Sequence, residues 1–220
     1  MTDGSVKGTL YDGFARVAGA LASPARIELL NLLAQGERGV DDLAAAAGLK
    51  VSNTSAQLKA LAEAGLVTWR RSGTRVFYRV ADPQVTDLVE LVKRVACDRL
   101  PAAREAARAW LGDEGDLEPV TRTELARRLH AGSILVLDVR PAAEYAAGHI
   151  PGALSIPLGD LPARLGTLPP DAEIVAYCRG RYCAMSPDAV RLLRDHGYQA
   201  HLMDGGLPEW RADGMPVATA

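Results

Sequence analysis

The sequence predicts two domains: a mostly helical one, followed by an α/β domain built on a parallel sheet. Three observations predict this division. The 220 residues suffice for two separate hydrophobic cores. Residues 1–111 carry 15 Lys and Arg against 12 Asp and Glu, whereas residues 112–220 carry 10 against 15. Residues 112–119, rich in Gly, acidic residues and Pro, form the expected linker between domains at 1–111 and 120–220.

The composition narrows the class of protein. Hydrophobic residues make up 48% and charged residues 24%, which is ordinary for a globular protein. No stretch reaches the ~20 apolar residues of a membrane span, and the N-terminus lacks the apolar segment of a signal peptide. We therefore expect a cytoplasmic protein with no membrane partner. Three cysteines are too few for a disulfide framework, so each is expected to be a free thiol.

The first half contains a pattern typical of a helix-turn-helix. Apolar spacing predicts helices over residues 9–22, 24–35, 41–47 and 52–64, with Ser52 able to cap the fourth and Gly48 in the turn before it. Strands at 66–70 and 75–80 then form an arginine-rich hairpin, a basic wing. An αα-hairpin that binds no DNA is the alternative. The residues expected to contact DNA are Ser52, Asn53, Thr54, Ser55, Gln57, Lys59, Arg70, Arg71 and Arg75.

Residues 21–27 and 57–67 resemble the ArsR family of dimeric winged-helix repressors. The resemblance implies a homodimer that places its fourth helix in the major groove of a double-stranded DNA operator. It also implies that the first and last helices pair between protomers. The last helix is expected over residues 83–110, and its many apolar residues fit a dimer seam. These are Val85, Leu88, Val89, Leu91, Val92, Val95 and Ala96.

Many relatives in that family sense metals, but this half of the chain offers few ligands. It has no histidine, and its third helix, where the family's thiol pair would lie, has no cysteine. We therefore expect no metal site. Cys97, on the last helix, is the one cysteine of this half. It is either a buried spectator or a sensor thiol that accepts an oxidant or a persulfide sulfur.

The second half alternates strands and helices. Strands are expected at 133–140, 153–157, 173–177 and 200–204, with helices near 142–147, 161–165 and 185–196. Thr121 and Glu124 fit a capping box that opens another helix to His130. Such alternation predicts a parallel sheet whose site lies at the carboxyl ends of the strands. Cys178 lies at such an end.

Cys178 opens a short loop that leads into a helix. Backbone N–H groups, the helix dipole and the flanking Arg179 and Arg181 would stabilise a thiolate there and lower its pKa. A buried structural cysteine is the alternative. The residues assigned to the reactive loop are Cys178, Arg179, Gly180, Arg181, Tyr182, Cys183 and Ala184.

Four motifs of the second half, at residues 137–140, 144–153, 178–184 and 205–210, resemble a single rhodanese domain. The resemblance implies sulfurtransferase chemistry in which Cys178 carries sulfane sulfur as a persulfide, with no separate cofactor. The loop amides would hold that anion, and Arg179 and Arg181 would attract the donor: thiosulfate, a polysulfide or a low-molecular-weight persulfide. Asp138 and Arg140 are interpreted as supports of the loop, and His149 as a packing residue.

The length of the loop separates rival reactions. Phosphatases and arsenate reductases of related fold need an arginine six positions after the cysteine, where this chain has Ala184. Sulfur chemistry is therefore favoured over phosphoryl transfer. Cys183 is either a packed thiol or a second reactive one, able to attack a Cys178 persulfide and release sulfide.

These patterns predict a transcriptional repressor that responds to reactive sulfur through a Cys178 persulfide, with Cys97 as a possible sensor. Two alternatives stay open. The first is a thiosulfate or persulfide sulfurtransferase whose DNA-binding domain regulates its own operon. The second is a sensor of an arsenic species that uses Cys178, Cys183 and Cys97.

Overall fold

The computed structural model describes residues 3–112, 117 and 119–220. The chain divides into two compact units, Met1–Lys93 and Arg94–Ala220, and each is described by itself. The division falls before the expected linker at 112–119, of which residues 113–116 and 118 lie outside the described residues.

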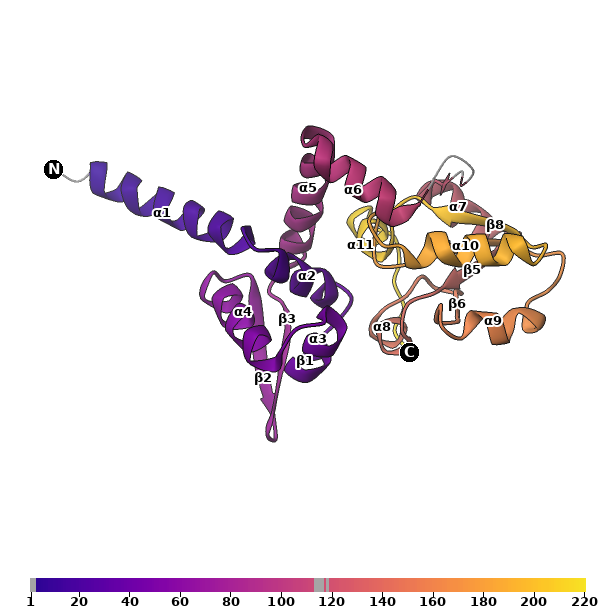
Figure 1. The fold of residues 1–220 in the computed structure, drawn as a ribbon, viewed down its shortest axis with the longest axis horizontal. Helices are drawn as coiled ribbons and strands as arrows, with labels where there is room; N and C mark the ends of the chain where they lie inside the picture. The colour runs from indigo at the N-terminus through magenta and orange to yellow at the C-terminus, as the bar shows by residue number, and fades with distance from the viewer. Residues whose placement is uncertain (1–2, 113–116, 118) are drawn as a thin grey trace. The chain divides into compact units, whose positions relative to one another are not determined.

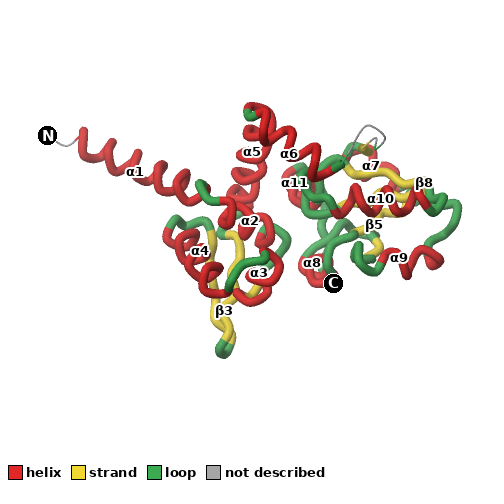
Figure 2. Tube along the Cα trace, in the orientation of Figure 1, coloured by secondary structure: helices red, strands yellow, loops and turns green. Residues whose placement is uncertain are grey.

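The first unit packs helices around a small antiparallel sheet with strand order β1-β3-β2 (Figure 1). The β2–β3 hairpin ends in a turn at Gly73, whose φ of 60° suits glycine (Figure 2). Strand β1 was not expected, because two residues are too few to show an alternating pattern. The elements that begin in this unit are α1 (Asp3–Leu21), α2 (Pro24–Leu33), β1 (Arg38–Gly39), α3 (Val40–Ala47), α4 (Val51–Glu63), β2 (Val67–Ser72), β3 (Arg75–Val80) and α5 (Pro83–Arg99).

The last helix of the DNA-binding half was expected to be continuous over 83–110, and this was wrong. It ends at Arg99, and α6 (Pro101–Leu111) begins after an extended Leu100, at φ −108° and ψ 109°. Pro101 is the physical reason, since proline has no N–H to donate and restricts the residue before it to extended conformations. The apolar residues expected at the dimer seam do not all stay available for pairing, because Val85 and Val89 are buried in the core of the first unit.

The second unit contains a five-stranded, fully parallel sheet with strand order β4-β8-β7-β5-β6. The four expected strands are present, and β4 is an additional edge strand. Thr121 caps α7 as expected, because its side chain accepts a hydrogen bond from the backbone N–H of Glu124. The elements after α6 are β4 (Pro119–Val120), α7 (Arg122–His130), β5 (Leu135–Asp138), α8 (Ala142–Ala147), β6 (Leu154–Ser155), α9 (Leu161–Arg164), η1 (Leu165–Thr167), β7 (Glu173–Tyr177), α10 (Met185–Asp195), β8 (Gln199–Met203) and α11 (Leu207–Ala212).

Successive residues of a strand point to opposite faces of the sheet, and this alternation builds two cores. On one face, Ile174 and Ala176 of β7 pack with residues of α9 and α10. On the other face, Val175 and Tyr177 pack with residues of α7 and α11. Cys178 continues the first series, so its side chain lies under α10.

Among the residues that the structure describes, no helix combines the length and apolar character required to cross a bilayer.

Candidate functional site: a paired-thiol loop

The loop after β7 buries its first cysteine completely. Cys178 has no exposed surface and belongs to the hydrophobic core beneath α10. Its Sγ lies 3.0 Å from Ser186 Oγ and 3.4 Å from the carbonyl oxygen of Cys183. The loop therefore folds back over the Cys178 side chain and shields it from solvent.

The two loop arginines are held by carboxylates. The guanidinium of Arg179 forms a bidentate pair with Glu144, with its shortest contact at 2.6 Å. Arg181 pairs with Asp204 at 2.8 Å. Both arginines were expected to lie beside the thiol and attract a donor, but these carboxylates already balance much of their charge.

A carboxylate fixes the conformation of the loop. Glu209 accepts hydrogen bonds from the backbone N–H of Arg181 at 3.2 Å and of Gly206 at 2.8 Å. Gly180, the residue before Arg181, has a φ of 145°, a conformation that favours glycine. Glu209 on α11 thus supports the loop from a part of the sequence almost 30 positions away.

Asp138 and Arg140 form a fully buried ion pair of 2.5 Å at the end of β5. Asp138 also accepts a hydrogen bond from the hydroxyl of Tyr177, the residue before Cys178. Arg140 donates to the carbonyl oxygen of Gly148. The pair therefore braces the end of the strand that carries the reactive loop. His149 stacks on Tyr145 at 3.7 Å between ring centroids, which is a packing contact.

The two thiols of the loop have opposite pKa shifts. Burial raises the pKa of Cys178 well above its ordinary value, and the hydrogen bond to Cys183 raises it further. The pKa of Cys183 is lowered from 9.0 to about 7, first by the hydrogen bond that Cys178 donates and then by backbone N–H groups of Arg179 and Met185. The expectation that the loop lowers the pKa of Cys178 is therefore wrong: the hydrogen bonds of Ser186 act in that direction, but burial outweighs them.

The expected DNA-contacting residues lie on α4 and on the hairpin. Of the α4 set, Ser52, Asn53, Ser55 and Lys59 are exposed. Thr54 is a correction, because it is fully buried and donates to the carbonyl oxygen of Lys50. Ser52 does not cap the helix, since Lys50 occupies the N-cap position.

The four further residues of that set differ in their freedom to reach a phosphate. Gln57 accepts a hydrogen bond from Arg26 at 3.0 Å. Arg70 pairs with Glu37 at 2.5 Å. Arg71 and Arg75 are exposed on the hairpin, so they are the side chains there that a DNA backbone meets most directly.

Comparison with known proteins agrees with both halves. Residues 23–68 match the bacterial regulatory protein, arsR family, and residues 121–213 match the rhodanese-like domain. The HTH-type transcriptional regulator Rv0324 of Mycobacterium tuberculosis is 49% identical over 211 residues, which cover 96% of this chain and 92% of that protein. This chain belongs to the ArsR family of transcriptional regulators. As an ArsR-family member it carries an additional rhodanese-like domain.

Two partial relatives match one half of this ArsR-family chain each. A sulfurtransferase of Allochromatium vinosum is 38% identical over 85 residues, covering 38% of this chain and 78% of that protein. The homodimeric winged helix-turn-helix DNA-binding domain Mb0332 of Mycobacterium bovis, solved in solution, is 48% identical. The match covers 43% of this chain and 87% of the Mb0332 domain, with a TM-score of 0.41.

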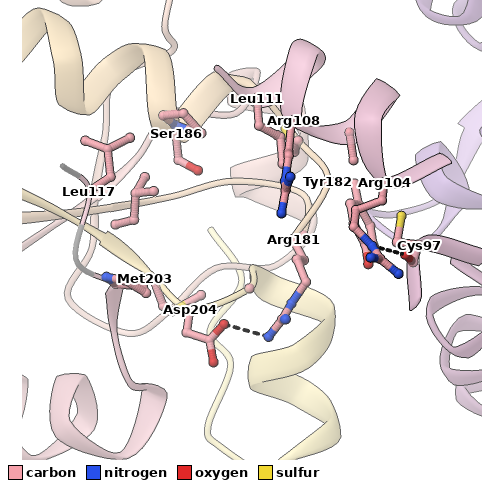
Figure 3. A pocket seen from close by; sticks show the side chains of 17 residues that line it. Cys97, Arg104, Arg108, Leu111, Leu117, Arg181, Tyr182, Ser186, Met203 and Asp204 are labelled. Carbon is pink, nitrogen blue, oxygen red and sulfur yellow. Dashed lines mark hydrogen bonds and ion pairs between the residues drawn. The ribbon is translucent and has the colours of Figure 1, made fainter. Parts of the chain in front are cut away.

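A pocket of about 360 Å³ adjoins the loop of this ArsR-family chain, within the second unit (Figure 3). Its wall includes Cys183 and also Cys97, near the end of α5. Cys97 contacts the side chain of Tyr182, and burial together with this contact raises the pKa of Tyr182 to about 12. Three arginines also line the pocket: Arg104, Arg108 and Arg181. Cys97, Cys183 and the three arginines thus line the same pocket.

Sequence reasoning missed three residues of this site. Ser186, which contacts Cys178, was treated only as part of a helix. Glu144 and Glu209 belong to the motifs at 144–153 and 205–210, but no role was assigned to either. Glu144 pairs with Arg179, which is far away in the sequence, and Glu209 accepts a hydrogen bond from Gly206 across a turn. A carboxylate in a motif next to a site rich in arginine was the signal available for Glu144.

The low pKa of Cys183 gives a prediction for alkylation. In a Cys97→Ser variant, iodoacetamide is expected to modify Cys183 with a midpoint near pH 7 and Cys178 only at higher pH, because the thiolate is the reactive form. Peptide mass spectrometry across a pH series measures both. A further Cys178→Ala change removes the S–H donor and is expected to raise the midpoint for Cys183. A midpoint unchanged by Cys178→Ala would contradict the assignment.

Proposed function

We propose that this ArsR-family chain is a homodimeric repressor whose affinity for its DNA operator responds to reactive sulfur carried by Cys178 of the rhodanese-like domain. The observation that carries the proposal is the buried Cys178 next to Cys183, which lines a pocket together with Cys97. The sulfur donor is a small anionic molecule such as thiosulfate, a polysulfide or a low-molecular-weight persulfide.

The DNA-binding part of the proposal rests on the exposed residues of α4 and the hairpin. Ser52, Asn53 and Ser55 lie in the first turn and a half of α4, where a recognition helix meets base edges and phosphates. Arg71 and Arg75 face solvent on the neighbouring hairpin and suit phosphate contacts.

The homodimer is supported by apolar surface on the first unit. Val6, Leu10, Tyr11 and Phe14 of α1 are between 54% and 68% exposed, which is unusual for a helix in a stable monomer. Phe14 also belongs to an apolar groove that α1 forms with α5. The groove suits the corresponding helices of a second copy, as the family's mode of pairing implies.

Helix α5 can transmit a change at the thiols to the DNA-binding unit. Cys97 lies near the end of this helix, and Val85 and Val89 of the same helix pack in the core of the first unit. A modification of Cys97, or a movement of Tyr182 against it, would act on a helix that is built into the DNA-binding unit. The sulfane sulfur on Cys178 is the proposed trigger.

Operator binding before and after polysulfide tests this function. The wild type is expected to lose about tenfold in affinity after treatment, a coupling typical of regulators. Cys178→Ser is expected to bind DNA as the untreated wild type does and not to respond, and Cys97→Ser shows whether this thiol transmits the signal. Arg127→Ala, an exposed change on α7, is the matched control. A Cys178→Ser variant that responds like the wild type would contradict the proposal.

A second candidate is a sulfurtransferase whose DNA-binding half regulates its own gene. The similarity to the Allochromatium vinosum sulfurtransferase favours it. Rapid turnover of thiosulfate with cyanide as acceptor, combined with an operator affinity indifferent to sulfur, would favour the enzyme over the sensor.

A further inference from the structure

The pocket reaches only one of the two loop thiols. Cys183 is partly exposed and belongs to the pocket wall. Cys178 has no exposed surface, and the described residues that line the pocket do not include it. A molecule that enters the pocket therefore meets the sulfur of Cys183 first.

The backbone amides also serve Cys183. The backbone of Arg179 and Met185 lowers the pKa of Cys183, and the backbone of Ser186 acts in the same direction on the pKa of Cys178. The N–H of Arg181 is engaged by Glu209, and the N–H of Cys183 donates to the carbonyl oxygen of Gly180. The cradle that a persulfide on Cys178 would need is thus partly occupied by the Cys183 sulfur.

The lining of the pocket fits an anionic sulfur donor. Arg104, Arg108 and Arg181 contribute positive charge, and Asp204 offsets part of it through its pair with Arg181. Arg104 is oriented by the carbonyl oxygens of Cys97 and Asp98, at 3.1 and 2.7 Å. A compact dianion such as thiosulfate is attracted by such a lining.

We propose that Cys183, the thiol on the pocket wall, takes the sulfane sulfur from the donor first and passes it to the buried Cys178. This order deepens the proposed function and rests on it, because it assigns how sulfur reaches Cys178. It differs from the direct loading of Cys178 that the rhodanese resemblance implies.

Both steps balance without an external oxidant. The Cys183 thiolate attacks the outer sulfur of thiosulfate, an S–S bond forms on Cys183, and the S–S bond of thiosulfate breaks to release sulfite. Cys178 then attacks the outer sulfur of the Cys183 persulfide as its proton passes to the departing Cys183 sulfur. The S–S bond is now on Cys178 and Cys183 is again a thiol, so the zero-valent sulfur has moved unchanged in oxidation state.

The geometry of the loop supports the second step. Cys178 Sγ lies 3.4 Å from the carbonyl oxygen of Cys183, so the loop brings the two cysteines together, and each thiol shifts the pKa of the other. Ser186 Oγ, 3.0 Å from Cys178 Sγ, is placed to donate to the thiolate that forms. Burial of Cys178 then protects the stored sulfur from other thiols.

Thiosulfate loading of the two-domain Cys97→Ser protein tests the order. Each sulfur adds about 32 Da, and peptide mapping assigns it to a cysteine. A Cys178→Ser change is expected to leave the added mass on Cys183. A Cys183→Ser change is expected to slow the loading of Cys178 by about tenfold or more, because the exposed attacking thiolate is lost. Emission of the buried Trp210 confirms that each variant is folded.

Three results would separate the proposals. Loading of Cys178 at the wild-type rate in Cys183→Ser, or no added mass on Cys183 in Cys178→Ser, would overturn the relay while leaving the proposed function intact. If Cys183→Ser does not fold, a time course of the parent protein decides, since added mass must appear on Cys183 before Cys178. Absence of added mass on either cysteine of the wild type would overturn the proposed function and the relay together.

Discussion

Replacing Arg140 with methionine is expected to lower the free energy of unfolding of the second unit by about 3–5 kcal/mol. Arg140 and Asp138 are both fully buried, so removing the guanidinium leaves the carboxylate charged and without its cation in the core. The change also removes the hydrogen bond to the Gly148 carbonyl and the contact of the guanidinium with the Tyr177 ring, 5.4 Å from its centroid. Burial by itself would lower the pKa of Arg140, but the bonds and charge of Asp138 raise it, which shows how far this pair depends on both members.

Urea unfolding followed by the emission of Trp210 measures this effect. Trp210 is 1% exposed in the core of the second unit, whereas Trp69 and Trp110 are largely exposed and change little. Arg127→Met is the control, because its pair with Glu124 is on the surface, where water and salt screen the attraction. Equal unfolding midpoints for the two variants would contradict the structural role of Arg140.

Replacing Gly206 with alanine is expected to displace the thiol loop and to destabilise the second unit by about 2–3 kcal/mol. A Cβ at this position would lie 2.3 Å from the backbone nitrogen of Gly180 and 2.5 Å from the carbonyl oxygen of Cys178. Both are main-chain atoms of the loop, so the clash cannot be relieved by rotating a side chain. The loop must shift, and with it the amides that hold the Cys183 sulfur.

Two measurements check the effect of Gly206→Ala. The urea midpoint is expected to fall, and the alkylation profile of Cys183 is expected to move to higher pH as the amides withdraw. Gly159→Ala is the matched control, since its added Cβ would have no heavy atom within 4 Å and its φ is not in the left-handed region. A Gly206→Ala protein with the stability and the alkylation profile of the wild type would contradict this account of the loop.

Much of the secondary structure could be predicted because it depends on residues that are close together in the sequence. The short apolar run at residues 173–177 predicts a buried strand, and the strand β7 has these same bounds. The capping box at Thr121 and the arginine-rich hairpin are likewise local signals, and the structure contains both. The break at Pro101 was available from the same rules, but the helix was predicted to run through it.

The sequence by itself determined the two-domain architecture, the family and the position of the thiol loop at the end of a strand, because these depend on residues close together in the chain. Only the tertiary structure decided which thiol of the loop is buried and which one lines a pocket. The partners of Cys178 and Cys183 come from a fold of the loop over itself, and those of Arg179, Arg181 and Gly206 come from α8, the end of β8 and α11. Burial and hydrogen bonding set a pKa through three-dimensional neighbours, and the order of residues along the chain does not state which neighbours those will be.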